Sequence, residues 1–415
     1  MDSARLHDGV ALTLISVVVL APLPHASNAP VFWLGSAALI FGAAAAFFAA
    51  GPLPVRLGFL GPVMAGLAIY LAFLLVQVSG ATSIAPRATS LGMLRVLGYS
   101  VFFFLLVQVM DCRRQRWMVI AVFGSISCYA LLGFLMQFGS GDWAHLFKTE
   151  AYPESATGPF INRNSFATFL GFGILVGLAL LLERAKRLRR AGVAYMADPR
   201  LVGLLSVLLL LVATQLATHS RMGVAATVLA AGLLVAGSRL AVIWWGAGAA
   251  LLSLALFGGA FLARMATVSE DAETRMALYA QMIEMIKDRP WAGHGLDSFV
   301  LAFQSYHSLE IDPDLIWDKG HNSYLTGWVE TGLVFGSIPV LLGLWLFVRL
   351  MAAKQRHSRL AAAAILLAGA HALVDFSLEI QANMYVFLAI VAMGTSAAIV
   401  GNPGGNRVGI GAKVR

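Results

Sequence analysis

The stretch that decides the fold is residues 164–182, which read NSFATFLGFGILVGLALLL and contain no charged side chain. Because a helix needs about 20 predominantly apolar residues to cross the hydrocarbon core of a bilayer, this stretch predicts a membrane-spanning helix. The next residues, 183–190, read ERAKRLRR and are strongly basic. A basic segment directly after a span is typical of the cytoplasmic side of a membrane protein.

The same apolar pattern recurs along the rest of the chain. Stretches of roughly the required length lie at 9–25, 31–50, 58–79, 89–110, 117–138, 164–182, 201–218, 222–237, 240–263, 322–348, 359–376 and 381–400. They predict an all-α integral membrane protein with about 12 transmembrane helices.

Composition supports this class. Of 415 residues, 59% are hydrophobic and only 12% are charged, whereas soluble domains average about 25% charged residues. Because a soluble surface must be acceptable to water, this composition excludes a soluble enzyme, a disordered chain and a nucleic-acid-binding domain. Most of the Lys and Arg side chains fall in loops on one side of the predicted spans, including 113–116, 184–200 and 349–359. That side is therefore expected to be cytoplasmic.

Two predicted outer loops are longer than a simple connection requires, at 139–163 and 264–321. The second loop is acidic overall and holds an amphipathic helix predicted at 270–289, which Pro290 ends. Its apolar face is predicted from residues at helical spacing: Met276, Tyr279, Met282, Ile283 and Ile286. We expect this helix to lie on the membrane surface or over the bundle.

Three side chains near the predicted outer face are candidates for chemistry, because ionisable groups at membrane depth are costly and commonly functional. Arg221 lies in a very short connection between two spans, and Arg275 lies in the first turns of the outer helix. His321 opens the tenth span, where its imidazole could accept a proton from an attacking hydroxyl. The alternative for each is an interface or solvated side chain.

Polar residues also precede the sixth span. Asn162, Arg163 and Asn164 could bind sugar hydroxyls or phosphate, or could cap the helix. The sequence contains no Gly-rich phosphate loop and no metal-ligand cluster. This argues against a nucleotide-sugar enzyme that requires a divalent cation, and we expect neither a metal nor a cofactor.

The last spans carry further ionisable residues. His371, Asp375 and Glu379 are spaced four apart, so they are expected to share one face of a helix. His371 and Asp375 could form a buried structural pair or a proton relay of the kind found in transporters. Glu330 is expected to meet a partner inside the bundle.

Four segments in this order resemble the O-antigen ligase family, which also contains polysaccharide polymerases of bacterial envelopes. They are GPFINRN at 158–164, Ser220-Arg221, the run from Arg275 to Gly295, and HNSY at 321–324 followed by ETGL at 330–333. The similarity covers roughly residues 155–350. The predicted spans and the long loop before the tenth span agree with it.

The resemblance implies a GT-C-like glycosyltransferase of the bacterial inner membrane, with its active site on the periplasmic side. The implied donor is a glycan on undecaprenyl pyrophosphate, and the implied acceptor is lipid A-core for a ligase or the next lipid-linked repeat unit for a polymerase. It implies catalytic roles for Arg221, Arg275 and His321. Substrate-binding roles are expected for Asn162, Arg163, Asn164, His294 and Asn322.

In the implied reaction, two guanidinium groups stabilise the leaving pyrophosphate, as a metal ion does in other enzymes. His321 accepts the proton of the attacking hydroxyl or orients it, and a one-step displacement inverts the anomeric centre. The implied partners are the lipid-linked donor, a glycan acceptor and membrane lipids, without nucleic acid.

The predicted organisation has three parts: an N-terminal transmembrane bundle at 1–150, a ligase-like core at 151–350 and a C-terminal transmembrane pair with a tail at 351–415. The competing function is a twelve-span secondary transporter or flippase of envelope glycolipids, which the His371 and Asp375 pattern favours. Against it, residues 51–57 read GPLPVRL and lack a charged carrier signature, and the loop at 264–321 breaks the symmetry of a repeat. A non-catalytic scaffold is a third possibility.

Overall fold

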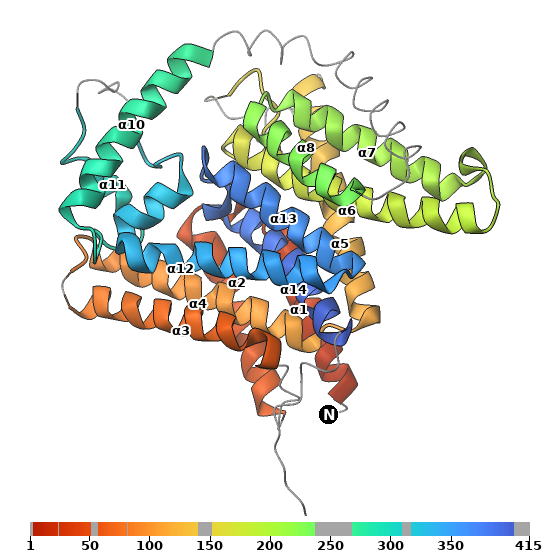
Figure 1. Cartoon of the computed structure of the whole chain (residues 1–415), viewed down its shortest axis with the longest axis horizontal. Helices are drawn as coiled ribbons and strands as arrows, with labels where there is room; N and C mark the ends of the chain where they lie inside the picture. Colours follow the sequence, from red (N-terminus) through yellow and green to blue (C-terminus); the bar gives the residue numbers. More distant parts are fainter. Residues whose placement is uncertain are drawn as a thin grey trace, which may run out of the picture.

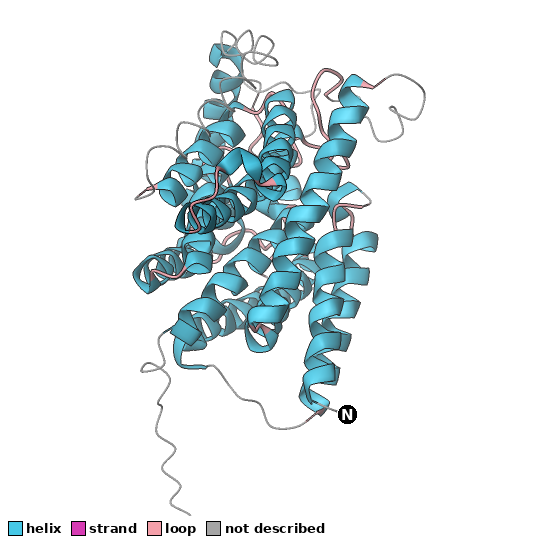
Figure 2. Ribbon diagram, turned by 90° about the vertical axis from the view of Figure 1, so that its right-hand side faces the viewer, coloured by secondary structure: helices cyan, strands magenta, loops and turns pink. Residues whose placement is uncertain are grey.

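The computed structural model describes residues 3–23, 25–50, 57–80, 82–139, 152–236, 268–308 and 317–401. Within these ranges the chain forms helices joined by turns and loops, with no strand (Figure 2). This confirms the predicted all-α class. The predicted span at 240–263 lies outside the described residues.

Most of the predicted spans form helices in the expected order. They are α1 (Ser3–Leu20), α2 (Pro30–Ala49), α3 (Leu57–Ser79), α4 (Pro86–Val109), α5 (Cys112–Phe138), α6 (Arg163–Arg190), α7 (Pro199–Ala217), α8 (Arg221–Val235), α12 (Ser323–Ala353), α13 (Arg356–Ala372) and α14 (Gln381–Gly401). Among the described residues, 8 helices are long and apolar enough to cross a membrane, and α8 is apolar but shorter. The chain is thus a multi-pass membrane protein, while the number of 12 spans stays a prediction.

Among the candidate spans that the structure describes, helix α6 is the most deeply buried. Every side chain from Ser165 to Gly177 is buried, and its glycines let neighbouring helices approach closely. A Cβ at Gly173 would press on Ile126 of α5, and one at Gly177 would press on Leu208 of α7. Small residues serve this purpose in membranes, where van der Waals packing holds helices together.

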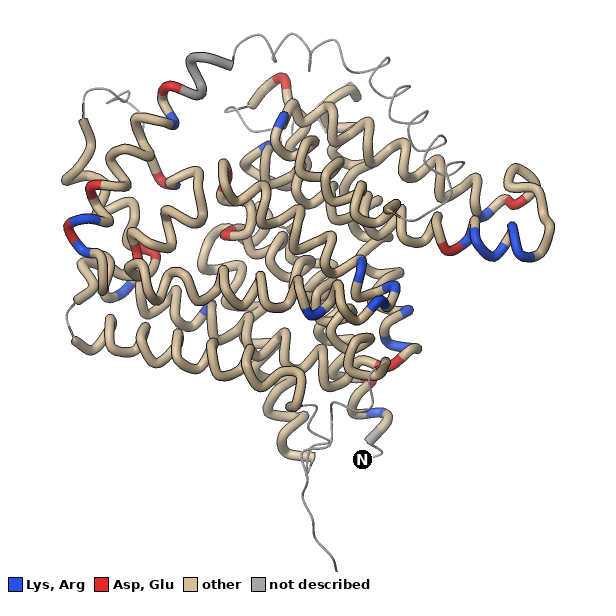
Figure 3. The backbone as a smooth tube through the Cα atoms, in the orientation of Figure 1, with Lys and Arg blue, Asp and Glu red and all other residues tan. Residues whose placement is uncertain are grey.

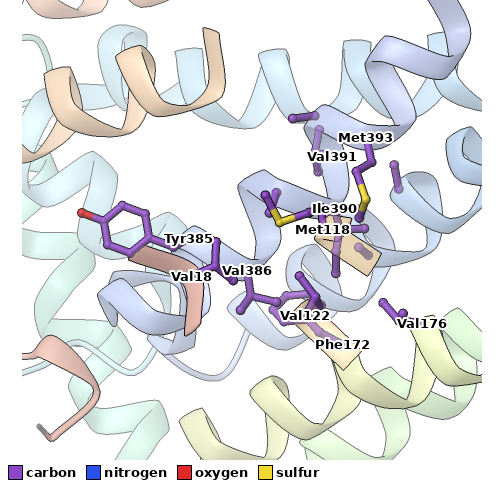
Figure 4. Close-up of a cluster of buried hydrophobic side chains, with 14 of the residues drawn as sticks. Val18, Met118, Val122, Phe172, Val176, Tyr385, Val386, Ile390, Val391 and Met393 are labelled. Atoms are coloured by element: carbon purple, nitrogen blue, oxygen red, sulfur yellow. The ribbon is translucent and has the colours of Figure 1, made fainter. Parts of the chain in front are cut away.

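A cluster of buried apolar side chains joins α6 to three other helices (Figure 4). It contains Val18 of α1, Met118 and Val122 of α5, Phe172 and Val176 of α6, and Val386 and Ile390 of α14. The cluster therefore fixes the C-terminal helix α14 against spans from the first half of the chain.

The bundle has two chemically different ends. In Figure 1, α3, α4 and α12 run side by side, and α10 (Val268–Asp288) lies across one end of them. Lys and Arg gather at the other end, where α6 and α7 are joined and α13 begins (Figure 3). The α10 end is the one at which the candidate residues meet.

Helix α10 confirms the predicted outer helix within two residues at its start and one at its end, and Met282 and Ile286 of its predicted apolar face are buried. Other residues of that face differ from the prediction. Leu278, Met282 and Met285 are fully buried, whereas Met276 is 66% exposed and Ile283 is 45% exposed. The buried residues pack on Val329 and on α11 (Phe299–Phe303). The prediction is wrong for Met276 and Ile283 because both sides of the helix carry apolar residues, and packing alone decides which of them are buried.

The predicted single span at 322–348 is wrong in one respect, because α12 breaks at Gly332. This glycine has φ 72° and ψ 168°, far from helical values. The chain folds back there, since the Trp328 indole donates to Ser337 Oγ at 3.1 Å. In a straight helix these residues would be about 13 Å apart along the axis. We call residues 323–331 the short arm of α12 and residues 333–353 its long arm.

The segment 292–298 packs against the end of the short arm and forms hydrogen bonds with the backbone carbonyls there. The backbone N–H groups of His294 and Gly295 donate to Val329 O at 2.9 Å and Glu330 O at 2.8 Å. Gln77 of α3 adds a bond from Nε2 to Glu330 O at 2.9 Å. These bonds satisfy acceptors that a helix end otherwise leaves unpaired.

Candidate active site

The candidate site forms where three loops meet at the α10 end of the bundle. These loops are 152–162 before α6, 317–322 before α12, and 373–380 between α13 and α14. Asn164 Nδ2 donates to Asp375 Oδ1 at 3.1 Å, and Asn322 Nδ2 donates to Leu373 O at 2.9 Å. The turn at 373–379 is therefore the common support of the other two loops.

His321 is held in an unusual backbone conformation at the centre of this arrangement. Its φ of 49° lies in the left-handed region, which few non-glycine residues adopt. Its carbonyl accepts a hydrogen bond from the Tyr279 hydroxyl of α10 at 2.8 Å. Its ring meets Phe376 edge-on at 5.1 Å and Trp317 at 6.0 Å between centroids. Strained residues that the surroundings hold in place are frequent at functional sites.

Two polar ring atoms in this part of the site have no protein partner among the described residues. His321 Nδ1 is buried without a hydrogen bond, and so is the indole Nε1 of the neighbouring Trp317. A buried polar group without a partner costs about 1–3 kcal/mol, so it calls for a functional explanation. An imidazole acceptor beside an indole donor is suited to a ligand rich in hydroxyl groups.

The surroundings of His321 favour its neutral form. Burial lowers the pKa of His321; the carboxylate of Asp375 opposes this shift, and the charge of Arg275 adds to it. A neutral imidazole can accept a proton, as a general base must. The electrostatic environment therefore agrees with the role expected from the sequence.

Arg275 links α10 to the turn at 373–379. Its Nη1 donates to Val374 O at 3.0 Å, and the side chain is half-buried. Because a guanidinium carries five N–H donors in a rigid fork, this bond orients the group and leaves other donors in the same plane. Tyr279 lies one turn further along α10 and holds His321, so one helix positions both groups.

Arg221 lies at the start of α8, outside the turn at 373–379. The loop at 152–162 before α6 connects the two places. Arg221 is the first residue of α8, whose N-cap is Ser220. Ala156 N donates to Ala217 O at 2.8 Å, and Ser155 Oγ lies 3.2 Å from His219 Nδ1. These bonds tie the end of α7 to the loop that leads to Asn162.

The loop before α6 also carries Tyr152 and Arg163. The guanidinium of Arg163 lies over the Tyr152 ring, 5.1 Å from its centroid. Burial raises the pKa of Tyr152, and the charges of Arg163 and Arg275 counter this shift while Asp375 adds to it. Tyr152 therefore lies within the field of groups from α6, α10 and the turn at 373–379.

Two of the three asparagines among the predicted binding residues act as helix caps. Asn162 Oδ1 accepts from Asn164 N at 2.7 Å and Ser165 N at 3.2 Å at the start of α6. Asn322 Oδ1 accepts from Tyr324 N at 3.1 Å and Leu325 N at 3.0 Å at the start of α12. The capping alternative for Asn162 is thus observed, and both side chains fix the loops that carry the charged groups.

His294 lies apart from this arrangement, although the sequence grouped it with the binding residues. Its Nε2 lies 3.1 Å from Met285 O, and its ring meets Tyr306 edge-on. The ring is buried beneath the C-terminal half of α10. Its observed contacts fix the segment 292–298 against α10.

The expectation that His371, Asp375 and Glu379 share one helical face is wrong. Helix α13 ends at Ala372, so Asp375 lies in a turn and Glu379 lies in a short 3-10 helix. His371 Nδ1 lies 2.6 Å from Thr168 Oγ1. Asp375 instead accepts from Asn164, and from the hydroxyl of Ser377. The structure therefore replaces the predicted pair by contacts to α6.

Glu330 meets a partner inside the protein, as predicted. It is buried, and its Oε1 accepts from the Phe299 N–H at the start of α11 at 3.2 Å. A separate ion pair joins Arg95 Nη2 of α4 to Asp297 Oδ1 at 2.6 Å. These contacts hold the outer segments on the bundle and lie beside the candidate site.

Sequence reasoning missed several residues that build the site. Trp317, Lys319, Ser323 and Phe376 all contact the His321 loop or the turn that supports it. Their positions next to His321 and Asp375 in the sequence were the available signal. Within the described ranges, no group of three His, Cys, Asp or Glu side chains could hold a metal ion.

Comparison with known proteins gives one family. Residues 205–338 match the family model described as O-antigen ligase. The match includes Arg221, Arg275 and His321 and begins after the segment at 158–164. It confirms the resemblance stated from the four motifs over a narrower region than expected. No curated protein matches the chain.

Proposed function

Because this chain is a membrane enzyme of the O-antigen ligase and polymerase type, with that family's domain at residues 205–338, we propose that it transfers a glycan from undecaprenyl pyrophosphate to an acceptor sugar. The acceptor is lipid A-core for a ligase or a lipid-linked repeat unit for a polymerase. The reaction takes place at the periplasmic face of the bacterial inner membrane. The observation that carries the proposal is the buried Nδ1 of His321, which has no hydrogen-bond partner among the described residues and lies within the field of Arg275.

The chemistry follows from these groups. The acceptor hydroxyl oxygen attacks C1 of the donor sugar, and its proton passes to the neutral imidazole of His321. The bond between C1 and the pyrophosphate oxygen breaks, and that oxygen leaves with the electron pair. Arg275 and Arg221 stabilise the charge on the leaving pyrophosphate, because guanidinium groups bind phosphate oxygens bidentately and stay protonated. One displacement inverts the anomeric centre, and the step needs no metal ion.

The orientation in the membrane supports the proposed side. The basic end of the bundle, where α6 and α7 are joined, matches the excess of Lys and Arg expected on the cytoplasmic side (Figure 3). The candidate site lies at the opposite end, beneath α10 (Figure 1). Lipid-linked glycans presented in the outer leaflet would meet the site there.

The three-part division at 1–150, 151–350 and 351–415 is part of the proposal, with one consequence from the structure. The turn at 373–379 belongs to the third part, yet it supports His321, Arg275 and Asn164 from the second. The C-terminal pair therefore serves the site and is required for activity.

The test is a transfer assay with purified protein and defined substrates. Undecaprenyl-pyrophosphate-linked repeat units alone give a ladder of longer glycans if the enzyme is a polymerase. Transfer that requires lipid A-core identifies a ligase. In either case H321A leaves at most a small residual activity. R275K loses most activity, because an ammonium group replaces the two-pronged guanidinium.

The transporter alternative makes a different prediction. No transfer with either acceptor, together with full function of H321A and R275K in cells, would contradict the glycosyltransferase proposal. Transport that depends on a proton gradient would then be measured in vesicles. The structure gives His371 a hydrogen-bonded place against Thr168, which is less suited to a carrier's proton relay than the predicted pair.

A further inference from the structure

One carboxylate holds the chain on both sides of His321. Glu379 Oε2 accepts from Lys319 Nζ at 2.9 Å, and Glu379 Oε1 accepts from Ser323 Oγ at 3.3 Å. Lys319 and Ser323 lie two residues before and two residues after His321. The two oxygens of a single side chain thus hold the chain on both sides of His321, and we call these two contacts the bracket.

The same turn also supplies the surface against which the ring rests. Phe376 lies three residues before Glu379; its ring meets the His321 ring edge-on at 5.1 Å. The ammonium of Lys319 lies 5.8 Å from the centroid of the same phenyl ring. Ser323 Oγ also donates to Asp375 O at 3.2 Å. The loop therefore sits on the turn through polar bonds at its edges and an aromatic contact at its centre.

This bracket holds His321 in a strained backbone conformation that would otherwise relax. A non-glycine residue in the left-handed region costs of order 1–3 kcal/mol and persists only when its surroundings fix it. His321 is such a residue, with φ 49°. Loss of the bracket would let the 317–322 loop move towards an ordinary conformation and carry the imidazole with it.

Resting on the proposed role of His321 as proton acceptor, we propose that Lys319 and Glu379 are positioning residues. Their ion pair, with Ser323, fixes the His321 loop on the turn at 373–379 and so places the imidazole for the acceptor hydroxyl. The pair acts on the reaction through His321, without binding the glycan. A displacement of about 1 Å in such a group can lower the rate about 100-fold.

The exposure of Lys319 and Glu379 argues against a purely stabilising role, because a partly exposed ion pair contributes little to stability. The side chains of Lys319 and Glu379 are 26% and 21% exposed, so their attraction is partly screened. A matched control is the pair Lys287 and Glu284 on α10, joined at 2.6 Å, with side chains 63% and 62% exposed. Both pairs lie on the outer elements, but the control touches no residue of the His321 loop in the structure.

The first experiment compares E379Q and K319M with the control E284Q in the transfer assay. We expect kcat to fall about 10- to 100-fold in E379Q and K319M, while KM for donor and acceptor changes little. E284Q is expected to match the wild type. The exchange K319E/E379K is expected to recover at least about tenfold over E379K alone, because it restores an ion pair between the same positions.

A double-mutant cycle then tests whether Glu379 acts through His321. In the H321A background, E379Q is expected to cause no further loss of residual activity, since the group it positions is absent. If E379Q lowers the activity of H321A by the same factor as it lowers that of the wild type, Glu379 acts independently of His321. That result would overturn the proposal. An exchange variant no better than E379K would overturn it as well, even where H321A has no measurable activity.

A measurement without turnover keeps this inference separate from the proposed function. Hydrogen exchange at the Tyr324 and Leu325 amides, which Asn322 caps, is expected to be faster in E379Q than in the wild type and unchanged in E284Q. Unchanged exchange in E379Q contradicts the bracket itself. Faster exchange in a protein that transfers no glycan contradicts only the proposed function.

Discussion

Replacement of Gly332 by alanine tests the break between the two arms of α12. The φ of 72° and ψ of 168° at this position belong to a region that is essentially restricted to glycine. A Cβ there would also lie 2.9 Å from Pro290 O and closer still to the Trp291 carbonyl, which are backbone atoms that cannot rotate away. The variant must therefore distort the break or displace the 290–291 segment.

The expected cost can be worked from these two effects. The dihedral strain costs about 1–3 kcal/mol. Displacement of Pro290 also weakens the bond from Leu333 N to Pro290 O at 2.8 Å, which contributes about 1 kcal/mol. We expect G332A to be destabilised by about 3 kcal/mol, which is a large fraction of the stability of a folded protein.

Gly343 in the long arm provides the matched control. A Cβ at this position meets nothing within 4 Å, and alanine in a helix interior is favoured over glycine by about 0.5–1 kcal/mol. The assay heats purified variants in detergent and measures unfolding as the loss of the monodisperse peak in size-exclusion chromatography. G332A is expected to melt clearly below the wild type, and G343A at or above it. Equal melting temperatures for the two variants would refute the argument from the break.

Three further predictions follow from the site and its supports. The pH dependence of kcat/KM is expected to show an acidic limb with a midpoint below 6.5, because the lowered pKa of His321 keeps its basic form present until the pH falls through that pKa; a midpoint above 6.5 would contradict the assignment. W317F is expected to raise KM for a glycan without lowering the melting temperature, since the indole N–H has no protein partner, whereas W328F should lose stability with its bond to Ser337. Q77L is expected to lower stability by several kcal/mol, because it leaves Ala292 O, Glu330 O and Leu296 N without the bonds that Gln77 makes; a melting temperature equal to the wild type would show that these groups find other partners.

The helices were largely predictable from sequence. The length of an apolar stretch is a local property, and the thickness of the bilayer sets the length that a span must have. The break in α12 was not predictable in this way. Residues 330–336 read ETGLVFG, and a glycine within an apolar stretch is common in ordinary membrane helices. Only the approach of the 290–291 segment and the contact between the two arms make Gly332 adopt its conformation.

The sequence singled out some of the residues at the candidate site but not their arrangement. His321 and Arg275 stood out because each is an ionisable group at the edge of an apolar span or on an outer helix. Their common support, the turn at 373–379, begins about 50 residues after His321 and about 100 residues after Arg275, and much of it was predicted to continue a helix. Contacts of this kind depend on how α13 and α14 pack, and no local pattern records them.

The burial of single residues was also not predictable from their local sequence. His294 lies in a Gly-His-Gly turn and resembles an exposed ligand, yet it is buried against Met285. Met276 fits the apolar spacing of α10 as well as Leu278 does, yet it is exposed. The side of a helix that is buried depends on the partner surface, here the short arm of α12 and α11.

The short arm of α12 also constrains how the protein is assembled during synthesis. At 1.5 Å per residue, residues 323–331 extend only about 13 Å, too little to be recognised as a span of a bilayer about 30 Å thick. The carbonyls at its end need the amides of His294 and Gly295 and the side chain of Gln77, all of which leave the ribosome earlier. Its beginning needs Leu373, which leaves later. The partners that the end of the arm needs are therefore made before it. A chain released before α13 and α14 are made would reach the membrane with its His321 loop lacking the turn that supports it.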